Sequence, residues 1–386
     1  MSILVATLLA IYGLSVLSLC FNVWKTARLL RSPQSSVAAS QSKGPLPSLD
    51  VVIPVKDEVD HIGACIQSVL AQDYPIRRVI VVNDRSTDQT AEVVDEIQRR
   101  HDRVERVDVD DLPHGQYGKP HALHVASSRY AADLLAFVDS DFQLAPNCLR
   151  TLVGQLRARS LDWLAVMGRP ELSHFWERLL VPLLGAVTYA WYDPRKIADP
   201  KWPDAIGSGF LLVRRERYEQ IGGHGAVAAA YDEDSEIMRV AKRAGHPIAY
   251  VLTPGLFTLR MYGSFQRTAR GISRTFIGGL KTLPRFAVTI GALNFVSLVP
   301  FGLVALLVVL RWLGVPVPWE PGWWGWIALH LAAATALAQL IYAGAGGPRR
   351  YALLHPLGAA VLIGICIRAA GHLRRGRAIE WRGTSY

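Results

Sequence analysis

The stretch Leu134-Leu135-Ala136-Phe137-Val138-Asp139-Ser140-Asp141 joins an apolar segment to two aspartates that are one residue apart. The five apolar residues predict a buried β-strand. A strand that ends in Asp-x-Asp places its carboxylates at the carboxyl end, the edge where open α/β sheets bind ligands. Mg²⁺ prefers oxygen ligands and usually combines one or two carboxylates with substrate phosphates. The stretch therefore predicts a metal-assisted site for a nucleoside diphosphate.

Two other predicted strands end in polar groups. Residues 49–54 are followed by Lys56-Asp57-Glu58, and residues 79–82 are followed by Asn83-Asp84. Predicted helices at 62–70 and 89–100 follow these strands, and this alternation is typical of a parallel α/β sheet. All three polar groups then lie at one edge of the sheet. The sequence contains neither G-x-G-x-x-G nor G-x-x-x-x-G-K-[ST], which weighs against a dinucleotide site or a P-loop.

Long apolar segments predict an integral membrane protein. Hydrophobic residues make up 51% of the 386 residues. Residues 2–24, 286–310, 321–347 and 351–367 predict about four transmembrane helices. The first segment has no cleavage site and is followed by Lys25, Arg28 and Arg31, so it is an uncleaved anchor with this end in the cytosol. We therefore expect a protein of the cell (inner) membrane with a cytosolic catalytic domain.

The formal net charge of +10 is unevenly distributed, since no acidic residue lies between Glu236 and Glu320. A strongly basic chain is often a nucleic-acid-binding protein. Here the basic residues flank apolar segments, which favours the headgroups of anionic lipids as partners. We predict no nucleic-acid partner. The four cysteines lack metal-type spacing and predict a reduced, disulfide-free cytosolic domain.

These patterns divide the chain into consecutive regions. The prediction is a transmembrane helix at 1–24, a flexible cytosolic linker at 25–48, a catalytic α/β domain at 49–260, an amphipathic interfacial helix at 261–285, a transmembrane region at 286–373 and a basic tail at 374–386. Residues 174–192 are apolar but too short a run to cross a bilayer. This segment is either a second interfacial helix or a core helix of the soluble domain.

Several motifs, taken in order, resemble those of family-two glycosyltransferases with the GT-A fold. The match covers residues 49–262 and includes Ile53-Pro54-Val55-Lys56-Asp57-Glu58, Val82-Asn83-Asp84-Arg85-Ser86-Thr87-Asp88, Gly118-Lys119-Pro120-His121-Ala122-Leu123, Asp139-Ser140-Asp141 and Asp232-Glu233-Asp234. In the second motif Asn and Arg replace the first Asp and the Gly of the family's Asp-Asp-Gly-Ser element. The resemblance implies an α/β GT-A fold, in which a Rossmann-like sheet binds a nucleotide sugar, together with transmembrane and interfacial helices.

The resemblance also implies roles for residues at the sheet edge. The donor, a nucleotide sugar, would contact Pro54, Val55, Asp57, Glu58, Asp84, Lys119, Asp139 and Ser140. Among these, Asp84 would accept a hydrogen bond from the uracil imide. A divalent metal ion, Mg²⁺ or Mn²⁺, would be bound by Asp141, Asp139 and Gln143 and would neutralise the diphosphate leaving group. Gln143 can equally be an ordinary loop residue.

The resemblance makes Asp234 the general base, with Glu233 beside it. A positioned carboxylate can take the proton of an acceptor hydroxyl as the new bond forms. One base without a covalent nucleophile implies single displacement and inversion at the anomeric carbon. The alternative is that the acidic cluster only caps the helix that follows it and interacts with its dipole.

Gly207-Ser208-Gly209 resembles the segment before the base, where small residues leave room for the acceptor. It can also be a glycine turn that leads into a buried strand, and the two interpretations are compatible.

The segment 265–283 predicts an amphipathic helix. Its apolar residues recur at helical spacing, and the opposite face carries Arg267, Arg270, Arg274 and Lys281. The three arginines either hold the site near the acceptor and the diphosphate or act only as positive-inside anchors. The processive members of the family carry Q-x-x-R-W near this position. Here the sequence is Gln266-Arg267-Thr268-Ala269-Arg270, which disfavours synthesis of a polymer.

The closest resemblance is to the membrane-bound subgroup that glycosylates lipids such as hopanoids, carotenoids or ceramide. We therefore predict an inverting glycosyltransferase that moves one sugar, from a UDP-sugar in the first instance, to a lipid acceptor at the cytosolic face. The rivals are a processive polysaccharide synthase and a catalytically silent membrane scaffold. One conflict stays open: four crossings place the tail outside, whereas Arg374, Arg375 and Arg377 favour the cytosol, unless residues 351–367 are re-entrant.

Overall fold

The computed structural model describes residues 2–31, 45–260, 262–317, 320–375, 380–381 and 384–385. The chain divides into two compact units, which we call the helical unit and the α/β unit. The helical unit comprises Met1–Ser36, Leu172–Thr188 and Tyr262–Gly376. The α/β unit comprises Val37–Glu171, Tyr189–Met261 and Arg377–Tyr386. Residues 172–188, which lie inside the predicted catalytic domain at 49–260, therefore pack with the helical unit.

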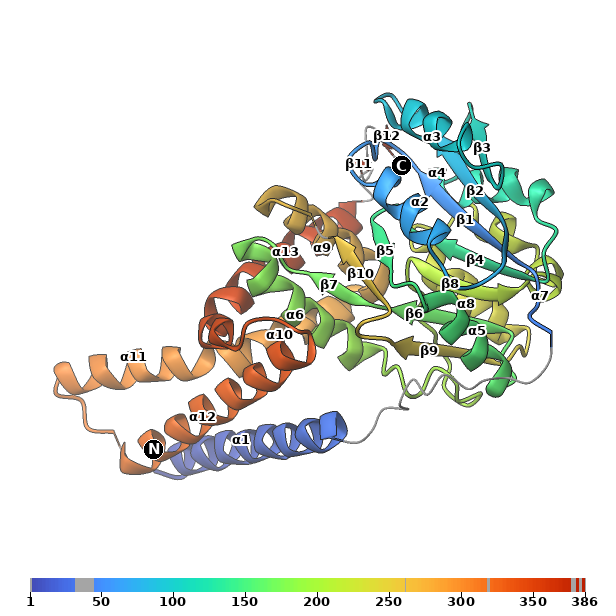
Figure 1. The fold of residues 1–386 in the computed structure, drawn as a ribbon. Coiled ribbons are helices and arrows are strands. Elements are labelled where there is room, and N and C mark those ends of the chain that lie inside the picture. The colour runs from blue at the N-terminus through green and yellow to red at the C-terminus, as the bar shows by residue number, and fades with distance from the viewer. Residues whose placement is uncertain are drawn as a thin grey trace. The chain divides into compact units, whose positions relative to one another are not determined.

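The α/β unit is built on a seven-stranded sheet with the order β3-β2-β1-β4-β8-β6-β9 (Figure 1). The strands are β1 (Leu49–Val55), β2 (Ile76–Asp84), β3 (Val104–Val109), β4 (Leu134–Val138), β6 (Trp163–Met167), β8 (Phe210–Arg214) and β9 (Ile248–Leu252). The sheet is mixed rather than wholly parallel, because β8 runs antiparallel to both β4 and β6. As a result, β8 begins at the edge where β4 ends.

Helices cover both faces of this sheet. The helices α2 (Ile62–Leu70), α3 (Thr90–Gln98) and α5 (Cys148–Ala158) share one core with Val51 and Ile53 of β1. The helices α4 (Gly118–Val125), α7 (Arg215–Gln220) and α8 (Glu233–Arg243) share the other core with Val52. Neighbouring side chains of a strand point to opposite faces, so β1, which is buried throughout, contributes to both cores. Two short 3-10 helices, η1 (Ala126–Arg129) and η2 (Gly223–Val227), belong to this second layer.

A smaller sheet adjoins the end of β4. It has the order β5-β10-β7 and consists of β5 (Phe142–Leu144), β7 (Arg169–Glu171) and β10 (Phe257–Arg260). Because β5 starts directly after Asp141, the Asp-x-Asp turn is held between two sheets. The backbone amide of Arg260 donates to the carbonyl oxygen of Asp141 at 3.1 Å, which fixes this turn from the β10 side.

His224 lies in the core of the α/β unit and is only 1% exposed. Its backbone amide donates to the hydroxyl oxygen of Tyr218 at 3.0 Å, so the Tyr218 hydroxyl can donate its own proton to Nδ1 of His224, 2.9 Å away. The ring also packs edge-on against Phe137. Burial, reinforced by the positive charge of Lys119, lowers the pKa of His224 to about 3. His224 is therefore a neutral core residue rather than a site residue.

We expect this histidine to destabilise the fold in weak acid. Its pKa is lower in the folded state than the ordinary value of about 6.5, so the unfolded chain binds a proton that the folded chain does not. The free energy of unfolding should therefore fall by about 1.4 kcal/mol for each pH unit below about 6.5. Melting temperatures of the purified protein at pH 7.5, 6.5 and 5.5 measure this slope, and His224→Gln is expected to flatten it. Equal slopes in the two proteins would contradict the assignment.

The helical unit holds the apolar helices. They are α1 (Ser2–Arg31), most of α6 (Phe175–Trp191), α9 (Phe265–Leu280), α10 (Leu283–Ser297), α11 (Val299–Trp312), α12 (Glu320–Gly344), the turn η3 (Arg349–Leu354) and α13 (His355–Arg375). In Figure 1, α1 and α12 run side by side, in agreement with their contacts. α1 continues to Arg31, past the predicted linker boundary at residue 24, and residues 32–44 of that linker lie outside the described part of the chain. Two short strands, β11 (Glu380–Trp381) and β12 (Thr384–Ser385), follow in the tail.

The structure contains fewer candidate spans than the predicted four. Within the described residues, Pro321–Gly344 and Arg349–Arg375 are long and apolar enough to cross a membrane, and Val5–Phe21 is apolar but shorter. The segment predicted as a span at 286–310 is not one continuous helix, because α10 and α11 meet at a break with a bend of 55°; together they form a broken span or a re-entrant loop. Pro300 explains the break, since it lacks the amide proton that a continuous helix would need and suits the first turn of a new helix.

The apolar face of α9 is covered by protein. Ile272, Phe276 and Leu280 are at most 2% exposed, while Arg267, Arg270 and Arg274 lie on the exposed face. The helix packs along α13, and Gly271 faces the ring of Tyr262 so closely that an added Cβ would overlap it. The predicted amphipathic pattern is thus present, but its apolar side packs against neighbouring helices and leaves the arginines to face outwards.

Candidate active site

Lys119 lies at the centre of a cluster of carboxylates at the sheet edge. Its Nζ is 2.8 Å from Oδ1 of Asp139, 2.9 Å from Oε1 of Glu233 and 3.1 Å from both carboxylate oxygens of Asp234. Lys119 is at the start of α4, Asp139 follows β4, and the other two carboxylates lie in the first turn of α8. The structure thus brings Asp139, which was predicted to bind the donor and the metal, together with both predicted catalytic residues, Glu233 and Asp234, around Lys119.

Burial and charge act against each other in this cluster. Burial lowers the pKa of Lys119, but the three carboxylates outweigh this effect and hold the pKa well above its ordinary value. Burial raises the pKa of Asp234, and the ammonium group of Lys119 opposes this rise. A carboxyl group whose pKa is raised is a stronger base once it is ionised, and such groups are typical of catalytic sites.

Asp141 lies at the same edge of the sheet, between β4 and β5. Burial raises its pKa to about 7, and the neighbouring carboxylates of Asp139 and Glu58 add to this rise. The negative charges of Asp139 and Glu58 thus oppose ionisation of Asp141. Glu58 itself is 8% exposed, and its backbone amide donates to Oγ1 of Thr90 at 2.8 Å.

Gly207 and Gly209 allow close packing around the carboxylate cluster. A Cβ at Gly207 would overlap the backbone carbonyl of Asp234, and one at Gly209 would overlap the carboxylate of Asp139. The amide of Asp139 also donates to the carbonyl oxygen of Gly209 at 2.9 Å. Ser208 accepts from and donates to the backbone of Val166 at 3.1 Å and 2.8 Å, so its side chain is engaged with β6. In this structure Gly207 makes room for the backbone of Asp234 and Gly209 for the carboxylate of Asp139, and the segment leads into the buried strand β8.

Gly207→Ala is expected to reduce turnover by up to about 10²-fold, because a displacement of a catalytic group by about 1 Å can have an effect of this size. The added methyl group must push the backbone of Asp234 away from Lys119. Gly63→Ala is the matched control, since a Cβ there would meet only Cγ1 of Val93 at an ordinary 3.5 Å. Steady-state kinetics on both variants measure the effect. Equal activities would show that the start of α8 can shift without consequence.

The predicted uracil-binding residue Asp84 is already paired. Its Oδ1 accepts a hydrogen bond from Nε of Arg85 at 2.7 Å, and its side chain is 6% exposed. Arg85 has a φ of +53°, in the left-handed region that glycine adopts most easily. Arginine at this motif position therefore keeps the backbone shape of the family's glycine and adds a positive charge beside Asp84.

The loops after β1 and β2 are fastened to each other. Nζ of Lys56 donates to the carbonyl oxygens of Asp84 and Arg85 at 3.3 Å and 2.9 Å. Oδ1 of Asp57 accepts from the amide and hydroxyl of Thr87 at 2.7 Å and 3.2 Å. Asp57, predicted to contact the donor, thus also holds the second loop in place, with a φ of +50°.

The remaining predicted residues are distributed as follows. Pro54 and Val55 are buried in β1, Ser140 is 6% exposed between the two aspartates, and Gln143 lies in β5 opposite Thr258. Arg267, Arg270 and Arg274 lie on α9 in the helical unit, so they are not part of the carboxylate cluster of the α/β unit.

Two positions were not singled out from the sequence. Arg85 was visible as a departure from the family motif, but its pairing with Asp84 depends on the turn conformation. Arg239 is 7% exposed, and it pairs with Asp204 at 2.6 Å and with Glu236 at 3.1 Å. These contacts fasten the segment before Gly207 to α8. No sequence pattern signals them, because Arg239 and Asp204 lie 35 positions apart.

A model of the family described as "Glycosyltransferase like family 2" matches residues 47–270, which is more than half of the chain. The protein belongs to this family and is a glycosyltransferase.

Relatives with assigned names agree with this membership. The chain is 25% identical over 350 residues to 4,4'-diaponeurosporenoate glycosyltransferase of Staphylococcus aureus (strain USA300), and the match covers 88% of each chain. The protein of the same name from strain bovine RF122 / ET3-1 is 29% identical over 184 residues, which is 46% of each chain.

A solved structure shares the fold. The mannosyltransferase PcManGT from Pyrobaculum calidifontis, in complex with GDP-Man and Mn²⁺, aligns with a TM-score of 0.52 and 19% identity. The alignment covers 94% of this chain and 98% of that chain. The predicted GT-A fold with additional apolar helices is confirmed by this likeness together with the sheet order.

Proposed function

We propose that the protein transfers a single sugar from a nucleotide-diphosphate sugar, in the first instance a UDP-sugar, to a lipid acceptor in the membrane, with inversion at the anomeric carbon. The observation that carries this proposal is the convergence of Asp139, Glu233 and Asp234 on Lys119 at the edge where β1, β2 and β4 end. Such an arrangement supports a site in which a donor-side carboxylate and a base act together.

The donor contacts the loops that follow β1 and β2. We assign its nucleoside to Pro54, Val55, Asp57, Glu58 and Asp84, and its diphosphate side to Lys119, Asp139 and Ser140. The hydrogen bonds between the two loops support this assignment, because they make the pocket rigid before the donor binds. A preorganised pocket loses less conformational entropy when it binds a ligand.

A divalent cation, Mg²⁺ or Mn²⁺, suits the carboxylates at the end of β4. Among the described residues, no three His, Cys, Asp or Glu side chains are grouped to hold a metal by themselves. This agrees with ions that use one or two carboxylates and complete their coordination with substrate phosphates. Asp141 and Asp139 would hold the ion, with Gln143 as a further oxygen ligand. The raised pKa of Asp141 supports this fit, because a nearby cation compensates its buried charge. When bound, the ion neutralises the charge that develops on the departing diphosphate.

Asp234 acts as the base in this proposal. Its carboxylate takes the proton of the acceptor hydroxyl while the acceptor oxygen forms a bond to the anomeric carbon and the nucleoside diphosphate leaves. Lys119 orients this carboxylate and keeps a positive charge between it and Asp139. Glu233 shares the ammonium group and is the second candidate for the role of base.

The lipid acceptor and the membrane location rest on two observations. The helical unit contains apolar helices that are long enough to cross a membrane, and the relative from Staphylococcus aureus is named for the glycosylation of 4,4'-diaponeurosporenoate. We place the α/β unit on the cytosolic side because Lys25, Arg28 and Arg31 follow the first apolar segment. The exposed Arg267, Arg270 and Arg274 of α9 would then face anionic lipid headgroups.

The test is a transfer assay with the full chain in lipid vesicles. Radiolabelled UDP-glucose, UDP-N-acetylglucosamine and GDP-mannose are supplied separately with Mn²⁺ and with lipid extracts, and the organic phase is analysed by mass spectrometry. We expect label in one lipid that is heavier than its parent by a single sugar, and none with Asp234→Asn. Label in an insoluble polymer would favour a polysaccharide synthase, and binding without any product or donor hydrolysis would favour a silent scaffold.

A further inference from the structure

Both ends of α13 are connected to the α/β unit by short stretches of chain. Trp381 and Glu380 belong to the α/β unit, and Glu380 lies five residues after the end of α13, which spans at most about 18 Å. At the other end, the ring of Tyr351 lies 5.7 Å from that of Phe175. Phe175 is four residues after Glu171 of the α/β unit, which is at most about 14 Å of chain.

The beginning of α13 is also packed against α6. A Cβ at Gly358 would lie 2.7 Å from Leu183 and 3.3 Å from Leu179, so the glycine lets the two helices approach closely without a shift of these leucine side chains. The hydroxyl of Tyr342, near the end of α12, donates to the carbonyl oxygen of the same Leu179 at 2.6 Å. The segment 172–188 leaves the α/β unit and returns to it, so α6 cannot carry the chain across a bilayer. The end of α12 and the start of α13 are therefore next to a helix that stays on the side of the α/β unit.

We infer that α13 lies along the surface of the membrane, against the anionic leaflet on the side of the α/β unit, and that α1, α12 and the bent pair of α10 and α11 make the crossings. The 21 residues of α13 form a helix about 31 Å long, close to the thickness of a bilayer core. A spanning α13 would carry its last residue to the opposite side from Phe175. The short connection to Glu380 does not permit this, because the α/β unit lies on one side only. The inference rests on the membrane location in the proposed function and not on the acceptor.

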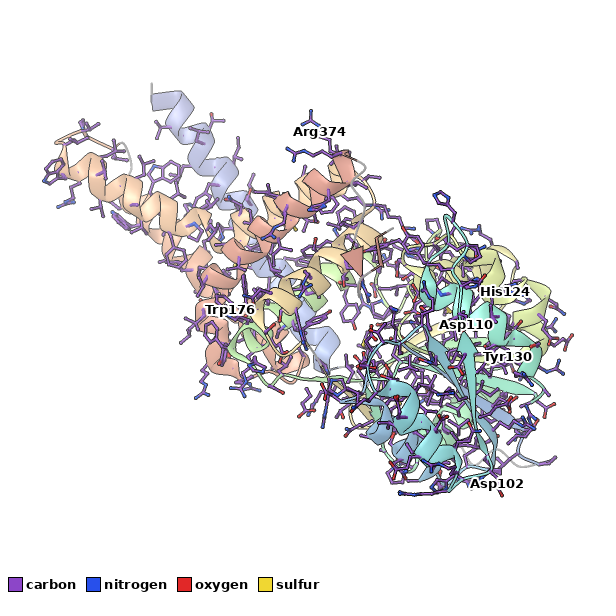
Figure 2. All side chains as sticks on the ribbon, turned by 90° about the horizontal axis from the view of Figure 1, so that it is seen from above. Asp102, Asp110, His124, Tyr130, Trp176 and Arg374 are labelled. Carbon is purple, nitrogen blue, oxygen red and sulfur yellow. The ribbon has the colours of Figure 1, made fainter. Side chains whose placement is uncertain are left out.

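The exposed side chains of α13 and η3 suit an anionic leaflet. Leu353, Leu357 and Ile367 are 66%, 45% and 58% exposed, so an apolar strip is available to the acyl chains. The exposed arginines are Arg349 and Arg350 before the strip and Arg368, Arg374 and Arg375 towards its end. Figure 2 labels Arg374 near the C-terminal end of α13 and Trp176 on α6. Arginines along a helix in the plane of the surface all reach headgroups, whereas a spanning helix would place some of them on each side.

α10 packs beside α13. Nδ1 of His355, the first residue of α13, is 3.0 Å from Oγ of Ser297, the last residue of α10, and the two helices pack along each other. The bend of 55° after Ser297 then turns α11 away from this layer. Three crossings place the tail on the same side as Lys25, Arg28 and Arg31. This removes the conflict between the arginines of the tail and a count of four crossings.

The test uses single cysteines in the full chain, reconstituted in vesicles that contain anionic lipid. Arg350→Cys and Arg375→Cys mark the ends of α13, and Pro321→Cys and Gly344→Cys mark the ends of α12 as the matched control. A membrane-impermeant maleimide is applied to sealed vesicles before and after lysis. The unsubstituted protein supplies the background, because Cys20 is partly exposed whereas Cys65, Cys148 and Cys366 are buried. We expect the two α13 positions to react from the same side and the two α12 positions from opposite sides.

A second measurement compares depth along α13. A fluorophore on Leu357→Cys or Ile367→Cys is quenched by lipids that carry a spin label at a shallow or a deep position. The two residues are separated by about 15 Å along the helix axis. We expect equal, shallow depths, whereas a spanning helix gives depths that differ by about 15 Å and overturns the inference. A lack of quenching by lipid at either depth would mean that another protein surface covers the strip and would also overturn it. Equal accessibility of both α12 positions from one side would instead contradict the membrane location in the proposed function.

Discussion

Asp234→Asn is expected to reduce the turnover number by at least about 10²-fold, the lower end of the usual contribution of a general base. The amide has the same shape as the carboxylate but cannot take the proton of the acceptor. Donor binding should persist, because the donor side of the site includes Asp139 and the fastened loops after β1 and β2. Single-turnover kinetics with a titration of donor affinity separate the two effects.

Glu236→Gln is the matched control for this variant. Glu236 lies in the same first turn of α8 and pairs with Arg239 at 3.1 Å. If the acidic cluster serves only as a helix cap, the two variants should lose similar, small amounts of stability and keep their activity. If Asp234 is the base, only Asp234→Asn should lose turnover. Near-normal turnover of Asp234→Asn would transfer the role to Glu233, and Glu233→Gln would then be the variant to measure.

Asp141→Asn is expected to abolish the dependence of donor binding on Mn²⁺ and to reduce transfer by about 10³-fold. Stabilisation of the leaving diphosphate by a metal is worth several kcal/mol, and each 1.4 kcal/mol corresponds to a factor of ten in rate. The readout is calorimetric binding of UDP with and without Mn²⁺, together with the transfer rate. An excess of chelator should reduce the unaltered protein to the rate of the variant.

Asp95→Asn is a suitable control for this experiment, because Asp95 lies on α3 outside the cluster and is 47% exposed. It should keep both the metal dependence and the rate. Full activity of the unaltered protein in excess chelator would contradict the assignment of a metal to Asp139 and Asp141. The positive charge of Lys119 would then be the main counter-charge for the diphosphate.

Local sequence patterns determined the elements at the site. The apolar residues 134–138 form the strand β4 as predicted, and the polar groups after β1, β2 and β4 follow the carboxyl ends of parallel strands. These elements can be predicted from sequence because the side chains of a strand determine whether it is buried. The polar groups can be placed together because the carboxyl ends of parallel strands lie at one edge of the sheet. The order of the motifs was sufficient to indicate the family.

The pairing of side chains required the tertiary structure. Lys119 and Asp234 are 115 positions apart, and only the packing of α4 and α8 on one face of the sheet brings them together. The direction of β8 likewise decided that Gly209 packs against the carboxylate of Asp139 and Gly207 against the backbone of Asp234. In the helical unit, the apolar run at 351–367 predicts a span or a re-entrant segment, and Arg349–Arg375 is long and apolar enough to cross a membrane. Whether such a helix crosses depends on where its two ends are held, and contacts distant in sequence, Phe175 with Tyr351 and Ser297 with His355, hold its beginning.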